Sequence, residues 1–262
     1  MLEVQHLSKT YGSGEAAVRV VDDLTFTVKE GEFVCIVGPS GCGKTTLLKM
    51  ISGLMPATSG EASFDGELIA GVPETLALVF QEYTRSLLPW LTVSENIALP
   101  IKKKHKREDC ERLTREALHA VGLDSFSDHY PWQLSGGMQQ RVAIARALAY
   151  HPKVLLMDEP FASVDAQTRS DLEDLMLGLR AQFGITVVLV THDIDESVYL
   201  ADRVVVLGPS PTRVVEIVDI NLPQPRDQIT TKELHEFANL RGHVMRLIKQ
   251  RVDSRNGAAT LS

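Results

Sequence analysis

Four apolar runs along the chain each end in a polar residue or a polar loop. They cover residues 33–37, 76–80, 154–157 and 186–190. Their near-continuous apolar content is typical of short strands that are buried on both faces of a parallel sheet. Ligands of open parallel α/β sheets bind beyond the carboxyl ends of the strands. We therefore expect one crevice to be lined by the groups that end the four runs, which are Gly38, Gln81, Asp158 and His192.

Other segments have the periods of edge strands and of amphipathic helices. Residues 2–7 alternate between apolar and polar side chains as an edge strand would. Further strands are predicted at 18–21, 24–28 and 61–66. Between the second and third apolar runs the spacing predicts helices over residues 93–99, 108–121 and 135–149. The helix over 108–121 has one apolar face, made by Leu113, Ala117, Leu118 and Val121.

The composition restricts the class of protein. The 262 residues, 44% of them hydrophobic, suffice for one large or two modest domains with a core. A net charge of -7 argues against broad nucleic-acid binding, which favours basic surfaces. No stretch approaches the roughly 20 apolar residues that span a bilayer, so we expect a cytosolic chain unless a partner holds it at a membrane. The basic run 102–107 favours a solvated helix start over contact with anionic lipid.

The loop after the first apolar run has the pattern G-x-x-x-x-G-K-[ST] and lies between a predicted strand and a predicted helix. Its glycines let backbone amides converge on phosphate oxygens, and the helix adds its positive dipole end. Lys44 is expected to reach the outer phosphates of a nucleotide, and the Thr45 hydroxyl to bind Mg²⁺. A plain glycine-rich turn is the alternative, which the flanking strand and helix disfavour. The predicted nucleotide-binding residues are Gly38, Pro39, Ser40, Gly41, Cys42, Gly43, Lys44, Thr45 and Thr46.

Three further features accompany this loop. The cysteines at 35, 42 and 110 form no spaced set and are expected to remain thiols, and at Cys42 the backbone, not the thiol, is expected to face phosphate. Tyr11 lies beside two glycines, where it is either a packing residue or an aromatic face for a nucleotide base. Ser135 is a good N-cap, and the glycines at 136 and 137 leave the first-turn amides of its helix uncovered by side chains. This second anion site is expected to serve a nucleotide held by another chain.

The chain resembles the nucleotide-binding subunits of ATP-binding-cassette (ABC) transporters. The motifs that carry the resemblance stand in family order: the loop 38–45, Gln81, the signature segment 134–141 (Leu-Ser-Gly-Gly-Met-Gln-Gln-Arg), Asp158-Glu159, the loop 163–165 and His192. Val164 stands where family members often have Leu. The resemblance implies an α/β fold with a P-loop NTPase core, a mostly parallel sheet, an N-terminal antiparallel β subdomain and an inserted helical subdomain. It also implies a head-to-tail homodimer that holds two ATP molecules, each between one phosphate loop and the other subunit's signature helix.

The resemblance implies a role for each residue of the site. Glu159 is the candidate base, His192 positions the γ-phosphate and the attacking water, and Tyr11 stacks on adenine. The implied Mg²⁺ ligands are Thr45, Gln81 and Asp158, and the implied catalytic residues are Glu159, His192, Gln81 and Lys44. The implied contacts to the partner's nucleotide are Ser135, Gly136, Gly137 and Gln139. Taken alone, Gln81 and His192 have ordinary readings as strand caps, and Glu159 as a helix-start carboxylate.

Segments 87–93, 208–213 and 222–227 resemble the nitrate, sulfonate and taurine importer subfamily. This implies membrane permease subunits, a separate solute-binding protein, and a peripheral location on the cytoplasmic side of the inner membrane. The alternatives are a soluble ABC-type ATPase switch that is not coupled to transport, and an importer for another small solute. We expect an ABC ATPase domain over 1–230, with the helical subdomain inserted at about 88–150. A C-terminal helix over about 231–251 and a flexible tail follow, within residues 231–262.

Overall fold

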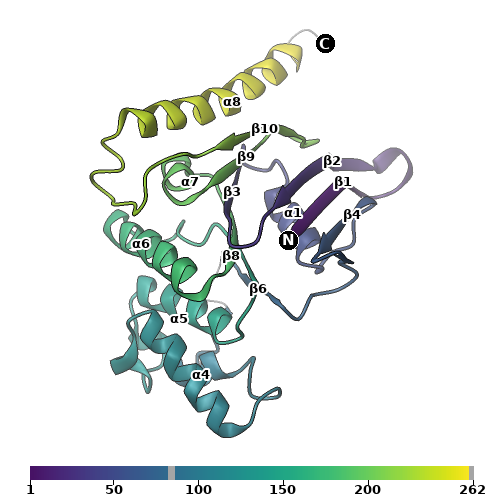
Figure 1. Cartoon of the computed structure of the whole chain (residues 1–262). Helices are drawn as coiled ribbons and strands as arrows, with labels where there is room; N and C mark the ends of the chain where they lie inside the picture. Colours follow the sequence, from purple (N-terminus) through teal and green to yellow (C-terminus); the bar gives the residue numbers. More distant parts are fainter. Residues whose placement is uncertain (82–85, 260–262) are drawn as a thin grey trace. The chain divides into compact units, whose positions relative to one another are not determined.

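The computed structural model describes residues 1–81 and 86–259, which form two compact units. Residues 1–73, together with those from 186 onward, make the first unit, and residues 74–185 make the second (Figure 1). The segment 88–150, predicted as a helical insertion, lies within the second unit. That unit also contains two strands and a long helix that follows them.

An antiparallel sheet in the order β2-β1-β4-β5 forms the N-terminal part of the first unit. Its strands are β1 (Leu2–Tyr11), β2 (Val18–Val28), β4 (Ser59–Phe64) and β5 (Glu67–Leu68), with a 3-10 turn η1 at Gly14–Ala16. The predicted edge strand at 2–7 is wrong, because β1 pairs with β2 on one side and β4 on the other. Alternation of apolar and polar residues indicates that one face of a strand is buried, but it does not indicate whether other strands pair with it on one side or on both. The two strands predicted at 18–21 and 24–28 are one strand, in which Asp23 has a φ of 57°.

The other sheet of the first unit has the order β10-β9-β3-β8. Its strands are β3 (Phe33–Val37), β8 (Thr186–Thr191), β9 (Arg203–Leu207) and β10 (Val214–Asp219). β3 is parallel to β8 and β9, and β10 is antiparallel to β9. Every residue of β3 and β8 is buried, as their continuous apolar runs predict. The mainly parallel sheet and the separate antiparallel sheet confirm the predicted α/β fold class.

Three helices of the first unit are α1 (Lys44–Ile51), α7 (Ile194–Leu200) and α8 (His235–Ala259). Helix α8 packs on α7, β9 and β10 (Figure 1). It begins later than predicted, because the Asp227 carboxylate accepts from the amides of Ile229 and Thr230 and holds a separate turn. The helix continues to Ala259, so the disordered tail expected from residue 253 is wrong up to that residue; 260–262 lie outside the described residues.

The second unit contains the parallel strands β6 (Leu76–Val79) and β7 (Val154–Asp158) and several helices. The helices are α3 (Val93–Ala98), α4 (Arg107–Ala120), α5 (Gly136–Leu148) and α6 (Ala166–Phe183), with 3-10 turns η2 (Asp124–Phe126) and η3 (Pro131–Gln133). The bounds of α3, α4 and α5 lie within one or two residues of the predicted ones, whereas α6 was not predicted. The apolar face predicted for the helix over 108–121 is buried at all four positions.

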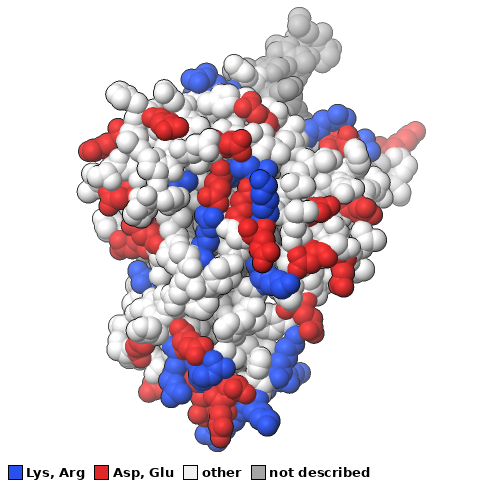
Figure 2. All heavy atoms as spheres, in the orientation of Figure 1, with Lys and Arg blue, Asp and Glu red and all other residues white. Residues whose placement is uncertain are grey.

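The surface around α4 is strongly charged with both signs, which Figure 2 shows in the lower part of the view. Ion pairs one turn apart join Arg107 to Glu111 and Arg112 to Glu116. The basic run that precedes the helix is exposed. No helix among the described residues is both long enough and apolar enough to span a bilayer.

Candidate nucleotide-binding site

The phosphate loop joins β3 to α1 and is closed by its own lysine. Gly43 is the N-cap of α1 with a φ of 110°, a conformation that side chains rarely adopt. A Cβ there would also lie 2.9 Å from the Val20 Cγ1 atom. The Lys44 ammonium is buried and donates to the carbonyl oxygens of Gly38 at 2.9 Å and Pro39 at 3.1 Å. The loop therefore combines a cation with a helix start whose first amides have no intrahelical partner.

Tyr11 lies beside the first turn of this helix. Its hydroxyl is 3.3 Å from the Thr46 Oγ1 atom and donates to the Met55 sulfur at 3.2 Å. The ring is 39% exposed, and the Lys9 ammonium is 5.5 Å from its centroid. The structure thus places an exposed aromatic ring next to the phosphate loop. The sequence alone had not decided whether Tyr11 is a packing residue or an aromatic face for a nucleotide base.

Cys42 turns its side chain into the protein. Only 1% of the residue is exposed, and its burial raises the pKa of the thiol, partly offset by Lys44 and by a hydrogen bond with Thr212. The thiol therefore does not line the open side of the loop, in line with the expectation that only the backbone at this position faces phosphate.

The register of β3 and β8 places His192 at the same sheet edge as the phosphate loop. Val37 pairs with Thr191 in this parallel pair, so Gly38 and His192 each follow the last paired residue of their strand. His192 is exposed. The Thr191 hydroxyl accepts from the Asp193 amide at 3.0 Å, and the Asp193 carboxylate then caps α7. The predicted neighbourhood of these two motifs is present within the first unit.

Gln81, Asp158 and Glu159 meet at one end of the β6–β7 pair in the second unit. Val79 pairs with Met157, so the residues that follow both strands leave the pair at the same end. The Gln81 side-chain amide donates to the Glu159 carboxylate at 3.4 Å. Asp158 is 5% exposed, and Glu159 is half-buried.

Glu159 has a strained backbone that sequence reasoning missed. Its φ is 45°, in the left-handed region. Such a conformation costs a non-glycine residue about 1–3 kcal/mol and is concentrated at functional sites. The following Pro160 was no signal for it, because a residue before proline favours extended conformations with negative φ. This outlier at the end of β7 marks Glu159 as a candidate functional residue.

Helix α5 begins within the signature segment 134–141. Ser135 is its N-cap as predicted, and the hydroxyl accepts from the Met138 amide at 3.3 Å. Gly136 is exposed, but Gly137 is buried, and a Cβ there would lie 2.3 Å from the Thr168 Cγ2 atom. Close packing on α6 is therefore a second reason for glycine at 137, besides the open amide. The Gln139 side chain donates to the Leu134 carbonyl at 3.1 Å, which fixes it at the start of its own helix.

Thr168 joins the signature segment to the loop 163–165. Its amide donates to the Asp165 carboxylate at 3.0 Å and its hydroxyl at 2.7 Å, so Asp165 caps α6. These hydrogen bonds from Thr168 lower the pKa of Asp165. Sequence reasoning missed Thr168, although its position three residues after an N-cap aspartate was a usable signal.

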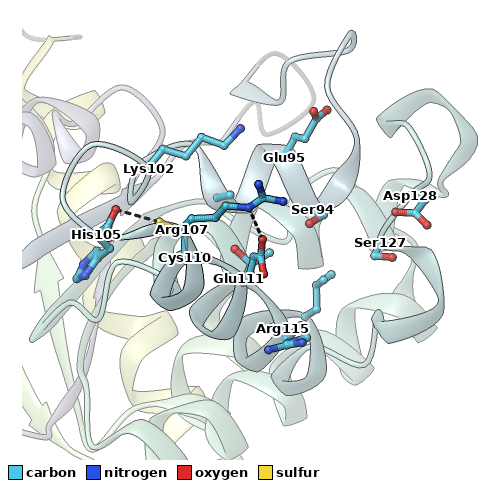
Figure 3. A pocket seen from close by; sticks show the side chains of 13 residues that line it. Ser94, Glu95, Lys102, His105, Arg107, Cys110, Glu111, Arg115, Ser127 and Asp128 are labelled. Carbon is cyan, nitrogen blue, oxygen red and sulfur yellow. Dashed lines mark hydrogen bonds and ion pairs between the residues drawn. The ribbon is translucent and has the colours of Figure 1, made fainter.

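A groove of about 870 Å³ in the second unit contains none of the predicted site residues. It lies along α3 and α4, and Figure 3 shows Lys102, Arg107 and Arg115 around it. No group of three or more His, Cys, Asp or Glu side chains suited to a metal ion occurs in the parts of the chain that the structure describes.

Comparisons with known proteins agree with these motifs. The family profile described as ABC transporter matches residues 21–162. The aliphatic sulfonates import ATP-binding protein SsuB of Bacillus cereus is 42% identical, over 93% of this chain and 94% of that protein. The bicarbonate transport ATP-binding protein CmpD of Synechocystis is 39% identical, over 95% of this chain and 89% of that protein.

Among solved structures, an ATP-binding cassette captured as a dimer, in a post-hydrolysis state with ADP and Pi, is 35% identical to this chain. The two align with a TM-score of 0.74, over 84% of this chain and 99% of that one. The relatives identified by sequence and the structure identified by fold are therefore all ATP-binding proteins.

Proposed function

This chain belongs to the ABC transporter family, and on that premise we propose that it energises the import of a small anionic solute such as nitrate, a sulfonate or taurine. The names of the relatives support the import role, and the observation that carries the ATPase part of the proposal is the register of β3 and β8. It pairs Val37 with Thr191, so that the phosphate loop and His192 leave the sheet at one edge. Ligands bind at such an edge in open α/β sheets.

The chain binds ATP and hydrolyses it, as ATP-binding subunits of this family do. We assign the β- and γ-phosphates to the loop amides and to Lys44, whose ammonium exchanges its two carbonyl partners for phosphate oxygens. Tyr11 stacks on adenine, which the position of its ring beside Thr46 supports.

Mg²⁺ neutralises phosphate charge in this type of reaction. The oxygen donors of this chain fit the ion, because Mg²⁺ prefers carboxylate and hydroxyl oxygen and retains several waters and phosphate oxygens. We assign the Thr45 hydroxyl and the Asp158 carboxylate as its protein ligands, with the Gln81 side-chain oxygen as a third.

Glu159 is the proposed general base. Its strained backbone and its hydrogen bond from Gln81 support a carboxylate held in one orientation. It accepts a proton from the water that attacks the γ-phosphate, and His192 orients that phosphate and the water. Asp158 is reserved for the metal and Lys44 for the phosphates, so binding and proton transfer are assigned to different side chains.

The proposed working form is a homodimer, as in the dimeric relative described above. Ser135, Gly136, Gly137 and Gln139 contact the nucleotide of the opposite subunit. The first-turn amides of α5 and the hydroxyl of Ser135 supply donors to the γ-phosphate there. Hydrolysis then depends on closure of the dimer.

The proposed partners in the membrane are permease subunits that carry the solute, supplied by a separate solute-binding protein. The chain sits peripherally on the cytoplasmic side of the cell membrane. The names of the relatives support a small anion as cargo. The cargo itself is chosen by the other subunits.

The test is reconstitution of the chain in vesicles with candidate permease and solute-binding proteins from the same organism. We expect ATP-dependent uptake of one of nitrate, a sulfonate, taurine or bicarbonate, and no uptake with the Lys44→Ala chain. An ATPase that neither co-purifies with a permease nor supports uptake would contradict the import proposal and favour an ATPase switch.

A further inference from the structure

The short helix α7 connects the sheet edge that carries His192 to the C-terminal part of the chain. It begins directly after His192 and Asp193, and the Asp193 carboxylate caps its first turn at 3.1 Å from the Glu196 amide. Its residues Ser197 to Leu200 are fully buried. A buried helix of this kind restricts the position of its N-cap Asp193, and so of His192 just before it.

Arg226, in the segment after β10, holds the opposite end of α7. Its Nη1 atom donates to the carbonyl oxygen of Val198 at 3.1 Å and to that of Tyr199, and its Nη2 atom donates to the Ala201 carbonyl at 2.8 Å. The last carbonyls of a helix have no intrahelical partners, and a cation is favourable there. A guanidinium satisfies several at once through its planar fork, which a lysine cannot copy.

The segment that follows Arg226 covers the outer side of α7. The Lys232 ammonium lies 4.8 Å from the centroid of the buried Tyr199 ring. Helix α8 buries Phe237 and Val244 and packs on α7. Arg241 of α8 forms an ion pair of 3.2 Å with Asp195, but both side chains are half exposed, so this pair contributes little. Arg226 therefore anchors the C-terminal end of α7 through three backbone carbonyls.

We propose that Arg226 is a positioning residue for His192: by fixing the C-terminal end of α7 it sets where the imidazole meets the γ-phosphate. The inference rests on the role proposed for His192 above. Arg226 touches neither nucleotide nor water in this scheme, and its effect passes through the backbone of α7. In this proposal the C-terminal segment contributes to ATP hydrolysis as well as packing on the first unit.

The test is steady-state ATP hydrolysis by the full chain with Arg226→Ala and Arg226→Lys. Coupling through an intervening element changes a rate by about 2- to 30-fold. We expect Arg226→Ala to lower kcat by that factor while KM for ATP stays within about twofold, because the phosphate loop and Tyr11 are untouched. Arg226→Lys should recover part of the loss. Arg213→Ala, which removes an ion pair with Asp22 on β2, is the matched control and should leave kcat unchanged.

A double-mutant cycle with His192→Ala separates positioning from general destabilisation. If Arg226 acts through His192, adding Arg226→Ala to His192→Ala causes no further loss of kcat. Equal fractional losses in both backgrounds, or a wild-type kcat for Arg226→Ala, would overturn the positioning role and leave the proposed function intact. A wild-type kcat for His192→Ala would remove His192 from the proposed mechanism and the positioning role with it. Circular dichroism melts report whether each variant is folded at the assay temperature.

Discussion

The phosphate loop and the signature segment are two helix starts that are both proposed to bind anions, and they differ in the groups that they offer. In the first unit, α1 begins at a left-handed glycine, and Lys44 adds a buried positive charge to the open amides. In the second unit, α5 begins at Ser135, whose hydroxyl already accepts from Met138, and its first turn carries no charged side chain. Amides and a hydroxyl without a cation bind phosphate more weakly than the same groups with one. We therefore propose that the first site captures the nucleotide and that the second joins it afterwards.

The two helix starts also differ in what fixes them. The phosphate loop is closed by contacts within itself, from Lys44 to Gly38 and Pro39. The signature segment is fixed by a neighbour, since Gly137 packs against Thr168 of α6, which in turn is bound to Asp165. The loop 163–165 is therefore linked to the signature helix through Thr168.

The largest expected effect comes from Glu159→Gln. The glutamine keeps an oxygen acceptor for Gln81 but loses basicity, so hydrolysis should fall by about 10²–10⁴-fold, the usual worth of a positioned general base. ATP affinity should survive, and an ATP-bound dimer should accumulate, because closure is released by hydrolysis. Size-exclusion chromatography with light scattering detects the dimer, and a phosphate-release assay measures the rate of ATP hydrolysis.

Two control variants sharpen this result. Ser135→Arg, added to Glu159→Gln, places bulk and charge at the signature segment and should return the protein to monomer. Glu111→Gln, on the exposed face of α4, should leave the rate unchanged. A Glu159→Gln protein that hydrolyses ATP at the wild-type rate would exclude Glu159 as the base.

Lys44→Ala makes the phosphate loop resemble the signature segment, with amides but no cation. Loss of one preorganised donor to the reacting group costs about 10²–10³-fold in kcat, and ATP binding should weaken strongly as well. Calorimetry and a hydrolysis assay measure the two effects, with Lys49→Ala on the same helix as the control. Near-normal turnover at saturating ATP would show that the amides suffice and that the comparison between the two helix starts is wrong.

Tyr11→Ala should weaken ATP binding by about 1–3 kcal/mol, the scale of base–aromatic stacking. Tyr11→Trp should be tolerated because it keeps an aromatic face, and Tyr11→Phe tests whether the bonds of the hydroxyl to Thr46 and Met55 matter. Calorimetry with each variant measures the affinity. Equal affinities for wild type and Tyr11→Ala would place the tyrosine outside the nucleotide site.

Gly137→Ala should destabilise the protein by about 1–3 kcal/mol, since the added methyl overpacks against the Thr168 Cγ2 atom. Adding Thr168→Ser removes that atom, keeps the hydroxyl for Asp165, and should restore much of the stability. Gly178→Ala in α6 is the control: its Cβ meets no other atom, so better helix propensity should raise the melting temperature. A Gly137→Ala protein as stable as wild type would mean that glycine there serves only the open amide.

The smallest effect concerns the Cys42 thiol. Because burial raises its pKa, the reactive thiolate is scarce at neutral pH, and alkylation should be slow there and accelerate under alkaline conditions. ATP should slow it further by holding the loop closed. Mass spectrometry locates the label, and the Cys42→Ser variant shows the background. Rapid labelling of Cys42 at neutral pH would contradict the buried thiol.

Local patterns in the sequence determined the phosphate loop, the buried strands β3, β7 and β8, and the N-cap of α5. The loop needs glycines, a lysine and a threonine at fixed spacing, and each makes its contribution within a few residues of the others. The continuous apolar runs predicted β3 and β8, because a strand that is buried on both faces has an apolar side chain at nearly every position. Ser135 was identified as an N-cap because capping is a contact with the next turn.

Only the tertiary structure decided which distant residues meet. The ring of Tyr11 lies beside Thr46, Gly137 packs on Thr168, and Arg226 reaches the end of α7. The same limit explains the error at β1, whose neighbours β2 and β4 come from other parts of the chain. Contacts between residues far apart in sequence leave no periodic trace in either segment, because each residue's identity is compatible with many partners.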